Sequence, residues 1–207
     1  MSLFITFEGG EGCGKSLQAK TLYDRLCREN IPAVLTCEPG GTPLGDEISR
    51  WVKWHEDSRI TPLTELLLFN ASRSQLIADV IQPGLVQGKV VVCDRFADST
   101  TVYQGYGRGL DMEMTQSINR AATGGLTPRL TVLLDMPPDE GFGRKQADKY
   151  DRFEKEEAAF HQRIRQGYLE LAAQEPQRWF IIDARQSQED IADAIWQKVS
   201  QLLPGRA

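Results

Sequence analysis

A short stretch near the start of the chain has the residues needed to bind phosphate. It fits the pattern G-x-x-x-x-G-K-[ST] at every defined position, with Gly9, Gly10, Glu11, Gly12, Cys13, Gly14, Lys15 and Ser16. Glycines can adopt backbone conformations that a side chain would forbid, so successive N–H groups of such a loop can point toward an anion. Lys15 would reach the outer phosphates of a nucleoside triphosphate, and Ser16 would hold Mg²⁺. We call Gly9–Ser16 the phosphate loop.

An acid and an arginine stand side by side at Asp94 and Arg95, directly after the apolar run Val90-Val91-Val92-Cys93. An acid that closes such a strand can hold Mg²⁺ directly or through a water molecule. Packing alone does not explain an acid and an arginine at the end of a buried strand, so we interpret the pair as functional.

Two further stretches could contact a ligand. Residues 98–105 combine hydroxyls, an aromatic ring and an amide, which together can stack on a flat polar ring and hydrogen-bond to its edge. Glu38, Pro39 and Gly40 follow an expected strand, and in open α/β sheets the ligand crevice lies at that edge. A plain strand-to-helix turn explains these three residues equally well.

Residues 143–152 are dense in cations, with Arg144, Lys145, Lys149 and Arg152, and have no apolar periodicity except at their ends. They predict a mobile basic lid that closes over a triphosphate and adds positive charge. A solvated helix face with ion pairs is the alternative interpretation.

The elements that must position these residues alternate between strands and helices. A buried strand at 3–7 leads into the phosphate loop and a helix at 17–29 follows it, as the phosphate-binding pattern requires. Further strands are expected at 33–37, 90–94, 130–135 and 179–183, and further helices at 45–54, 63–80, 111–122, 154–173 and 188–203. Five strands alternating with helices predict an α/β fold of three layers around a parallel sheet.

The helix expected at 63–80 is unusually apolar. Its apolar residues cover more than one face, which predicts burial against a second surface such as a partner subunit. Thr61 and Pro62 are expected to begin it as cap and first residue. From pattern alone, Arg73 in this helix is best explained as a solvated residue.

Length and composition favour one globular domain over residues 1–207. No apolar run reaches the ~20 residues of a membrane span and no signal peptide is evident, so we expect a cytoplasmic protein. The four cysteines are expected to be reduced, since none forms a C-x-x-C pair. The net charge of −5 argues against a general nucleic-acid binder.

The combination favours a small-molecule kinase. The chain has no N-K-x-D sequence and no D-x-x-G after Asp94, which argues against a GTPase switch. A single domain with a basic lid and a second polar and aromatic cluster predicts two bound small molecules, between which a γ-phosphoryl group passes in line.

At this point the chain resembles bacterial thymidylate kinases over nearly its whole length. The matching motifs, in the family's order and spacing, are Phe7-Glu8-Gly9, Glu38-Pro39-Gly40-Gly41-Thr42, Phe69 with Arg73, Asp94-Arg95-Phe96, Tyr103-Gln104-Gly105 and Asp151-Arg152-Phe153-Glu154. The resemblance implies a P-loop fold with a short lid and transfer of the γ-phosphoryl group of ATP to dTMP. It also implies use of Mg²⁺, a place in the pathway to dTTP, and a cytoplasmic homodimer, which agrees with the apolar helix at 63–80.

The resemblance also implies residue roles. On the donor side, the phosphate loop and Lys15 hold ATP, while Ser16 and Asp94 lie at the metal. On the acceptor side, Arg95 bridges the acceptor phosphate and the transferred group, and Arg50 also binds the acceptor phosphate. Glu11 meets the sugar 3′-hydroxyl, and Tyr103 excludes a ribose 2′-hydroxyl. The base stacks on Phe69, with Arg73 at a ring oxygen and Ser99 or Thr100 at the ring N–H, and the remaining substrate-binding residues are Glu38, Pro39 and Gln104.

The family has two styles of catalytic arginine, one inside the phosphate loop and one in the lid. Here the loop interior, Gly10 to Cys13, has no basic residue, so the lid must supply it; Arg144 and Arg152 are the candidates. Cys13 and Phe96 depart from the commoner alanine and tyrosine. Two other functions stay open: a kinase for another pyrimidine monophosphate or a nucleoside, and a nucleotide-binding module without turnover.

Overall fold

Five parallel strands form one sheet in the order β2-β3-β1-β4-β5. The computed structural model describes residues 2–55, 60–144 and 150–203. The strands are β1 (Leu3–Glu8), β2 (Ala33–Cys37), β3 (Val90–Asp94), β4 (Leu130–Asp135) and β5 (Trp179–Asp183). The expected parallel α/β sheet is therefore confirmed, and only the first strand differs in length, by one residue at Glu8.

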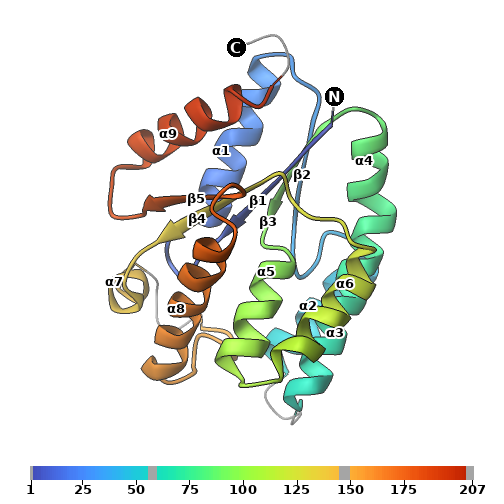
Figure 1. Cartoon of the computed structure of the whole chain (residues 1–207), viewed down its shortest axis with the longest axis vertical. Helices are drawn as coiled ribbons and strands as arrows, with labels where there is room; N and C mark the ends of the chain where they lie inside the picture. The colour runs from blue at the N-terminus through green and yellow to red at the C-terminus, as the bar shows by residue number, and fades with distance from the viewer. Residues whose placement is uncertain (1, 56–59, 145–149, 204–207) are drawn as a thin grey trace.

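Helices cover both faces of the sheet (Figure 1). In the described part of the chain the α-helices are α1 (Lys15–Arg28), α2 (Pro43–Trp54), α3 (Pro62–Leu76), α4 (Gln82–Val86), α5 (Ala97–Thr100), α6 (Met112–Thr123), α7 (Pro138–Gly143), α8 (Ala158–Gln174) and α9 (Gln188–Ser200). Two π-helical segments continue α3 and α5, namely η1 (Ile77–Ile81) and η2 (Thr101–Gly107). None of the helices in these residues is both long and apolar enough to cross a membrane.

The core lies on both sides of the central strand β1, whose six residues are all buried. Leu3, Ile5 and Phe7 pack with α1 and α9, which lie together on one face of the sheet (Figure 1). Phe4 points to the other face and packs with Leu76 of α3. A strand covered on both faces is expected to be largely apolar, as this one is apart from Thr6, which shares a hydrogen bond with Thr131, and Glu8.

Parallel strands bring their carboxyl ends to one edge of the sheet. The register pairs Phe7 of β1 with Asp94 of β3, and Cys37 of β2 with the same Asp94. The phosphate loop, the loop after β2 and Arg95 all leave the sheet at this edge, so the fold brings together segments that are far apart in the sequence.

The six predicted helices are confirmed, and three further helical stretches were not predicted. Thr61 caps α3 by accepting a hydrogen bond from Thr64 N at 3.3 Å, and Asp111 caps α6 through Met114 N at 2.8 Å. The stretches that were not predicted are the short helices α4 and α7 and the helical segments at 97–107. All three are rich in Gly, Pro, Ser, Thr or Asp, which have low helix propensity, so only tertiary packing makes them helical.

Candidate active site

One cavity of about 550 Å³ opens at the carboxyl edge of the sheet. Its wall collects most of the predicted site residues, namely Glu11, Gly12, Gly14, Lys15, Ser16, Glu38, Pro39, Phe69, Arg73, Asp94, Arg95, Ser99, Thr100, Tyr103 and Gln104. A volume of this size accommodates small organic ligands. The structure therefore joins the phosphate loop and the second polar cluster in a single site.

The phosphate loop turns on glycines that no side chain could replace. Gly12 has φ 70° and its backbone packs directly on that of Gly141 in α7, so that a Cβ on either glycine would collide with the other segment. Gly14, at φ 89°, forms the N-terminal cap of α1. The start of α1 thus faces the cavity with the positive end of its dipole and its unpaired N–H groups, which favour an anion.

Lys15 lies folded over this loop. Its ammonium group donates to Gly10 O at 2.5 Å and to Cys13 Sγ at 3.5 Å, and only 7% of the residue is exposed. Cys13 is buried and its thiol donates to Gly10 O at 3.0 Å. The thiol therefore takes part in the packing of the loop.

Ser16 and Asp94 meet as the sequence predicted. The Ser16 hydroxyl donates to Asp94 Oδ2, while Asp94 Oδ1 is buried and has no hydrogen-bond partner among the residues that the structure describes. A hydroxyl and a carboxylate with a spare oxygen are the hard oxygen ligands that Mg²⁺ prefers. The residues present fit a magnesium ion.

Arg95 is held rigidly at the centre of the cavity wall. Its backbone is in the left-handed region with φ 68°, which costs energy for a residue with a side chain. One terminal nitrogen donates to Glu11 Oε1 at 2.7 Å and to Tyr103 OH at 3.2 Å, and the other donates to Ser99 Oγ at 3.1 Å. Burial alone would lower the pKa of Arg95, but Tyr103 and Glu11 beside it hold that pKa above its ordinary value, so the guanidinium stays charged.

Glu8 helps to hold the residues around Arg95 in place, a role that the sequence did not reveal. The buried carboxylate accepts hydrogen bonds from Phe96 N at 2.8 Å, Ser99 Oγ at 2.6 Å and Tyr168 OH at 3.0 Å. Burial, together with the negative charge of Asp98, raises the pKa of Glu8 to about 7. An acid that ends an otherwise apolar strand was a usable signal for this role, whereas Tyr168, which lies far away in the sequence, gave none.

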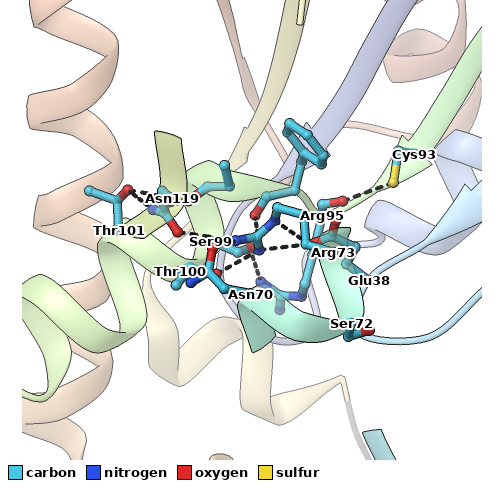
Figure 2. Close-up of polar contacts among 12 residues, drawn as sticks. Glu38, Asn70, Ser72, Arg73, Cys93, Arg95, Ser99, Thr100, Thr101 and Asn119 are labelled. Carbon is cyan, nitrogen blue, oxygen red and sulfur yellow. Dashed lines mark hydrogen bonds and ion pairs between the residues drawn. The ribbon is translucent and has the colours of Figure 1, made fainter. Parts of the chain in front are cut away.

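Arg73 is not a solvated helix residue: it is 2% exposed and forms a buried ion pair with Glu38, whose oxygen lies 2.6 Å from Nη2 (Figure 2). All its N–H groups have acceptors in the protein, supplied by Glu38, Asn70, Phe96 (backbone carbonyl), Thr100 and Asn119. Burial raises the pKa of Glu38, against the opposing pull of Arg73. The pair fixes the loop after β2 to α3 and to α5.

Aromatic rings form the part of the wall away from the phosphate loop. Phe69 of α3 is half-buried and its ring lies 5.7 Å from that of Phe153, which in turn lies 6.0 Å from Tyr103. Gln104, at the same end, is buried and donates to Glu65 Oε1 at 2.7 Å. This end of the cavity can stack on a flat ring, and the loop end can bind phosphate.

Three predicted cations do not line the cavity. Arg50 is exposed on α2 and pairs with Glu47 at 2.6 Å. Arg144 is exposed and donates to Ala184 O at 3.0 Å, and Arg152 donates to Val52 O at 2.9 Å and to Glu65 at 2.5 Å. The predicted lid at 143–152 lies partly outside the described residues, which include neither Lys145 nor Lys149.

Other lining residues had no predicted role. They are Leu17, Cys37, Lys53, Phe96, Asp151, Phe153 and Glu154. Asp151, Phe153, Glu154 and Phe96 belong to motifs that the sequence analysis recognised. Lys53 gave no signal, because a lysine near the end of an amphipathic helix is usually a solvated residue.

Comparisons with known proteins agree on one family. Residues 7–195 match the model of the family described as thymidylate kinase. A thymidylate kinase of Dehalococcoides mccartyi is 54% identical over 203 residues, covering 98% of each chain, and one of Roseiflexus sp. is 47% identical over 94% of this chain and 92% of its own. The crystal structure of thymidylate kinase from Ehrlichia chaffeensis superimposes with a TM-score of 0.76 at 32% identity, covering 96% of this chain and 98% of that one.

Proposed function

The chain belongs to the thymidylate kinase family, and from that premise we propose how its residues carry out the family reaction. It is an ATP-dependent phosphotransferase that converts dTMP to dTDP and releases ADP. The observation that carries the residue assignment is that the phosphate loop, the Asp94–Arg95 pair and the aromatic wall line one cavity. Phosphoryl transfer needs little bond chemistry from a protein, so positioning and positive charge supply most of the acceleration.

The phosphate loop and Lys15 bind the phosphates of ATP. Loop amides and the start of α1 supply fixed partial charges, and the ammonium group of Lys15 exchanges Gly10 O for phosphate oxygens. Ser16 and the spare oxygen of Asp94 would hold Mg²⁺, which would supply positive charge to neutralise the phosphates of ATP. The metal site therefore lies on the β3 side of the loop.

Arg95 bridges the acceptor phosphate and the transferred phosphoryl group. Glu11, Tyr103 and Ser99 already hold its guanidinium in one place, so little ordering remains to be done when the substrates bind. Glu11 also accepts a hydrogen bond from Tyr103 OH at 2.7 Å, and this pair sits where the deoxyribose passes. Glu11 then meets the 3′-hydroxyl, and the Tyr103 ring leaves no room for a 2′-hydroxyl.

The thymine ring stacks on Phe69. The hydroxyl of Thr100 accepts a hydrogen bond from Arg73 Nη2 at 2.6 Å. Its proton and its second lone pair remain able to form a hydrogen bond with the edge of the base. Arg73 shares its N–H groups between the protein acceptors and a ring oxygen, because none of them is free. Ser99 is already engaged by Glu8 and Arg95, which favours Thr100 over Ser99 as the partner of the ring N–H. Glu38, Pro39 and Gln104 complete the wall.

Arg144 and Arg152 belong to the lid at 143–152 and supply the cation that the phosphate loop lacks. To reach the γ-phosphate, Arg144 must leave Ala184 O, and Arg152 must leave Val52 O and Glu65. Such an exchange couples closure of the lid to substrate binding.

The protein also forms a homodimer through the α2 and α3 side. Helices α2 and α3 pack together, and their exposed large apolar side chains are Leu44, Trp51, Trp54, Leu63 and Leu67. An isolated monomer rarely exposes so many large apolar groups on two neighbouring helices. We place the protein in the cytoplasm, because all four cysteines are free thiols and the cytoplasm keeps thiols reduced. Sedimentation of the wild type and Leu67→Glu tests the dimer; a wild type that sediments as a monomer would contradict it.

A coupled ADP-release assay with Mg²⁺, ATP and one acceptor at a time tests the base assignment. The expected order of kcat/KM is dTMP above dUMP, with dCMP and ribose monophosphates far below, and the preference for dTMP over dCMP should shrink in Thr100→Val. Turnover that prefers another monophosphate would keep the phosphoryl transfer and overturn the assignment of the base end. ADP release that does not depend on any acceptor would overturn the two-substrate site.

A further inference from the structure

Helix α2 carries two cations three residues apart that lie in different surroundings. Arg50 is exposed and pairs with Glu47, and it is not part of the cavity wall. Lys53, near the end of the same helix, lines the cavity and is half-buried. Within the described residues Lys53 forms no ion pair, so its ammonium group has no fixed partner of opposite charge.

The charge of Lys53 acts on two other residues of the cavity wall, Cys37 and Asp151. Burial raises the pKa of the Cys37 thiol, as does Asp94, and the charge of Lys53 opposes both. Burial also raises the pKa of Asp151, and Lys53 again acts in the opposite direction. Cys37 ends β2 and pairs in register with Asp94, so the ammonium group acts between the end of β2 and the segment after residue 150.

The helix turn that carries Lys53 is fixed at both sides. The backbone N–H of Arg152 donates to Lys53 O at 3.1 Å on one side, and on the other the neighbouring Val52 is fully buried. The side chain of Lys53 therefore starts from a well-positioned backbone, and its four-carbon stem can bring the charge to a ligand in the cavity.

From this position we propose that Lys53 binds the phosphate group of the monophosphate acceptor, from the side opposite the phosphate loop. The inference rests on the proposed function and deepens its acceptor side. Phe69, proposed to hold the base, lies on α3, and α3 packs against α2. The acceptor phosphate then lies between Arg95 on the β3 side and Lys53 on the α2 side.

The chemistry of the acceptor explains why a second cation is useful. A phosphate monoester carries nearly two negative charges, and the transferred phosphoryl group adds more at the moment of reaction. Arg95 is already shared with Glu11, so part of its charge is compensated. Lys53, which has no ion-pair partner in the described part of the chain, restores the balance and shields the acceptor oxygen from the like charges of ATP.

Equilibrium binding tests the proposal most directly. Calorimetric titrations would compare dTMP, thymidine and ATP on the wild type, Lys53→Met and Lys20→Met, each checked for an unchanged thermal midpoint. Lys53→Met should weaken dTMP binding by about 10- to 100-fold and change thymidine and ATP binding by less than about twofold. Lys20→Met, the control at an exposed lysine of α1 that pairs with Asp24 and does not line the cavity, should leave all three unchanged. Lys53→Arg should restore most of the dTMP affinity.

Each alternative result has a distinct meaning. Equal dTMP affinity in the wild type and Lys53→Met would overturn the proposal, and so would a loss that thymidine shares, since that indicates a structural effect. A loss confined to ATP would place Lys53 on the donor side and also overturn it. A wild type that binds ATP but no dTMP would refute the proposed acceptor itself, and with it this role. If Lys53→Met does not fold, Lys53→Gln answers the same question.

Discussion

Replacement of Gly141 by alanine should displace the phosphate loop, because the backbone of Gly141 in α7 packs directly against it. A Cβ at residue 141 would lie 2.2 Å from Glu11 O, whereas ordinary contacts begin at 3.4 Å. Helix α7 and the loop must therefore separate by about 1 Å. Misplacement of that size at a catalytic site can lower the rate by about 10²-fold, and the strain costs on the order of 1–3 kcal/mol. Glu11 also holds Arg95, so the shift reaches both substrates.

The assay is steady-state ADP release, with kcat and both KM values measured for the wild type, Gly141→Ala and Gly143→Ala. Gly143 ends the same helix, and a Cβ there would meet no atom of the described residues within 4 Å. We expect kcat/KM for ATP to fall by about 10²-fold in Gly141→Ala and to stay within about twofold in Gly143→Ala. If both variants are as active as the wild type, the backbone contact between α7 and the phosphate loop does not govern catalysis.

Three further predictions concern a buried acid, a helix cap and the lid. The pKa of Glu8 is about 7 in the folded chain, against 4.5 for a free carboxyl. Between these pH values the folded chain keeps a proton that the unfolded chain loses, so the free energy of unfolding falls as the pH rises. Glu8→Gln has no such proton to lose. The difference in free energy of unfolding between Glu8→Gln and the wild type, measured in urea, should therefore shift in favour of the variant by on the order of 3 kcal/mol from pH 4.5 to 7.5. A difference that does not depend on pH would contradict the assignment. Thr61→Ala should lower stability by about 1 kcal/mol, seen as a lower thermal midpoint with unchanged kcat, because the N-terminal cap of α3 is lost; an unchanged midpoint would show that the cap contributes nothing. Arg152→Ala should lower kcat by about 10²-fold or more with a smaller change in KM for dTMP, and an unchanged kcat would remove Arg152 from the catalytic residues.

The sequence was sufficient for the sheet and for the phosphate loop because both depend on local signals. Short apolar runs bounded by Gly, Pro or acids predicted β2, β3, β4 and β5 with their observed ends. The glycine pattern predicted the loop, since a side chain would be strained at the positive φ of Gly12 and Gly14, and at Gly12 it would also collide with Gly141. A site that depends on residue types at fixed spacing, such as the phosphate loop, can therefore be predicted from the sequence before the fold is known.

The partners of the site residues could not be predicted in the same way. The buried pair of Arg73 with Glu38 joins residues 35 positions apart, and Tyr168 reaches Glu8 across 160 positions. Pattern alone placed Arg73 on the surface because arginine is usually exposed, and tertiary hydrogen bonds reversed that preference. Lys53 and Arg50 look alike in the sequence, and only the fold shows which of them lines the cavity.

The central claim is that one cavity passes a phosphoryl group directly from ATP to dTMP, and the stoichiometry of products tests it. With Mg²⁺, ATP and dTMP, chromatography of the reaction mixture should show dTDP and ADP formed in equal amounts by the wild type. Lys15→Met, which removes the ammonium group from the phosphate loop, should lower the formation of both by about 10²-fold or more. ADP accompanied by free phosphate, with no matching dTDP, would contradict the account.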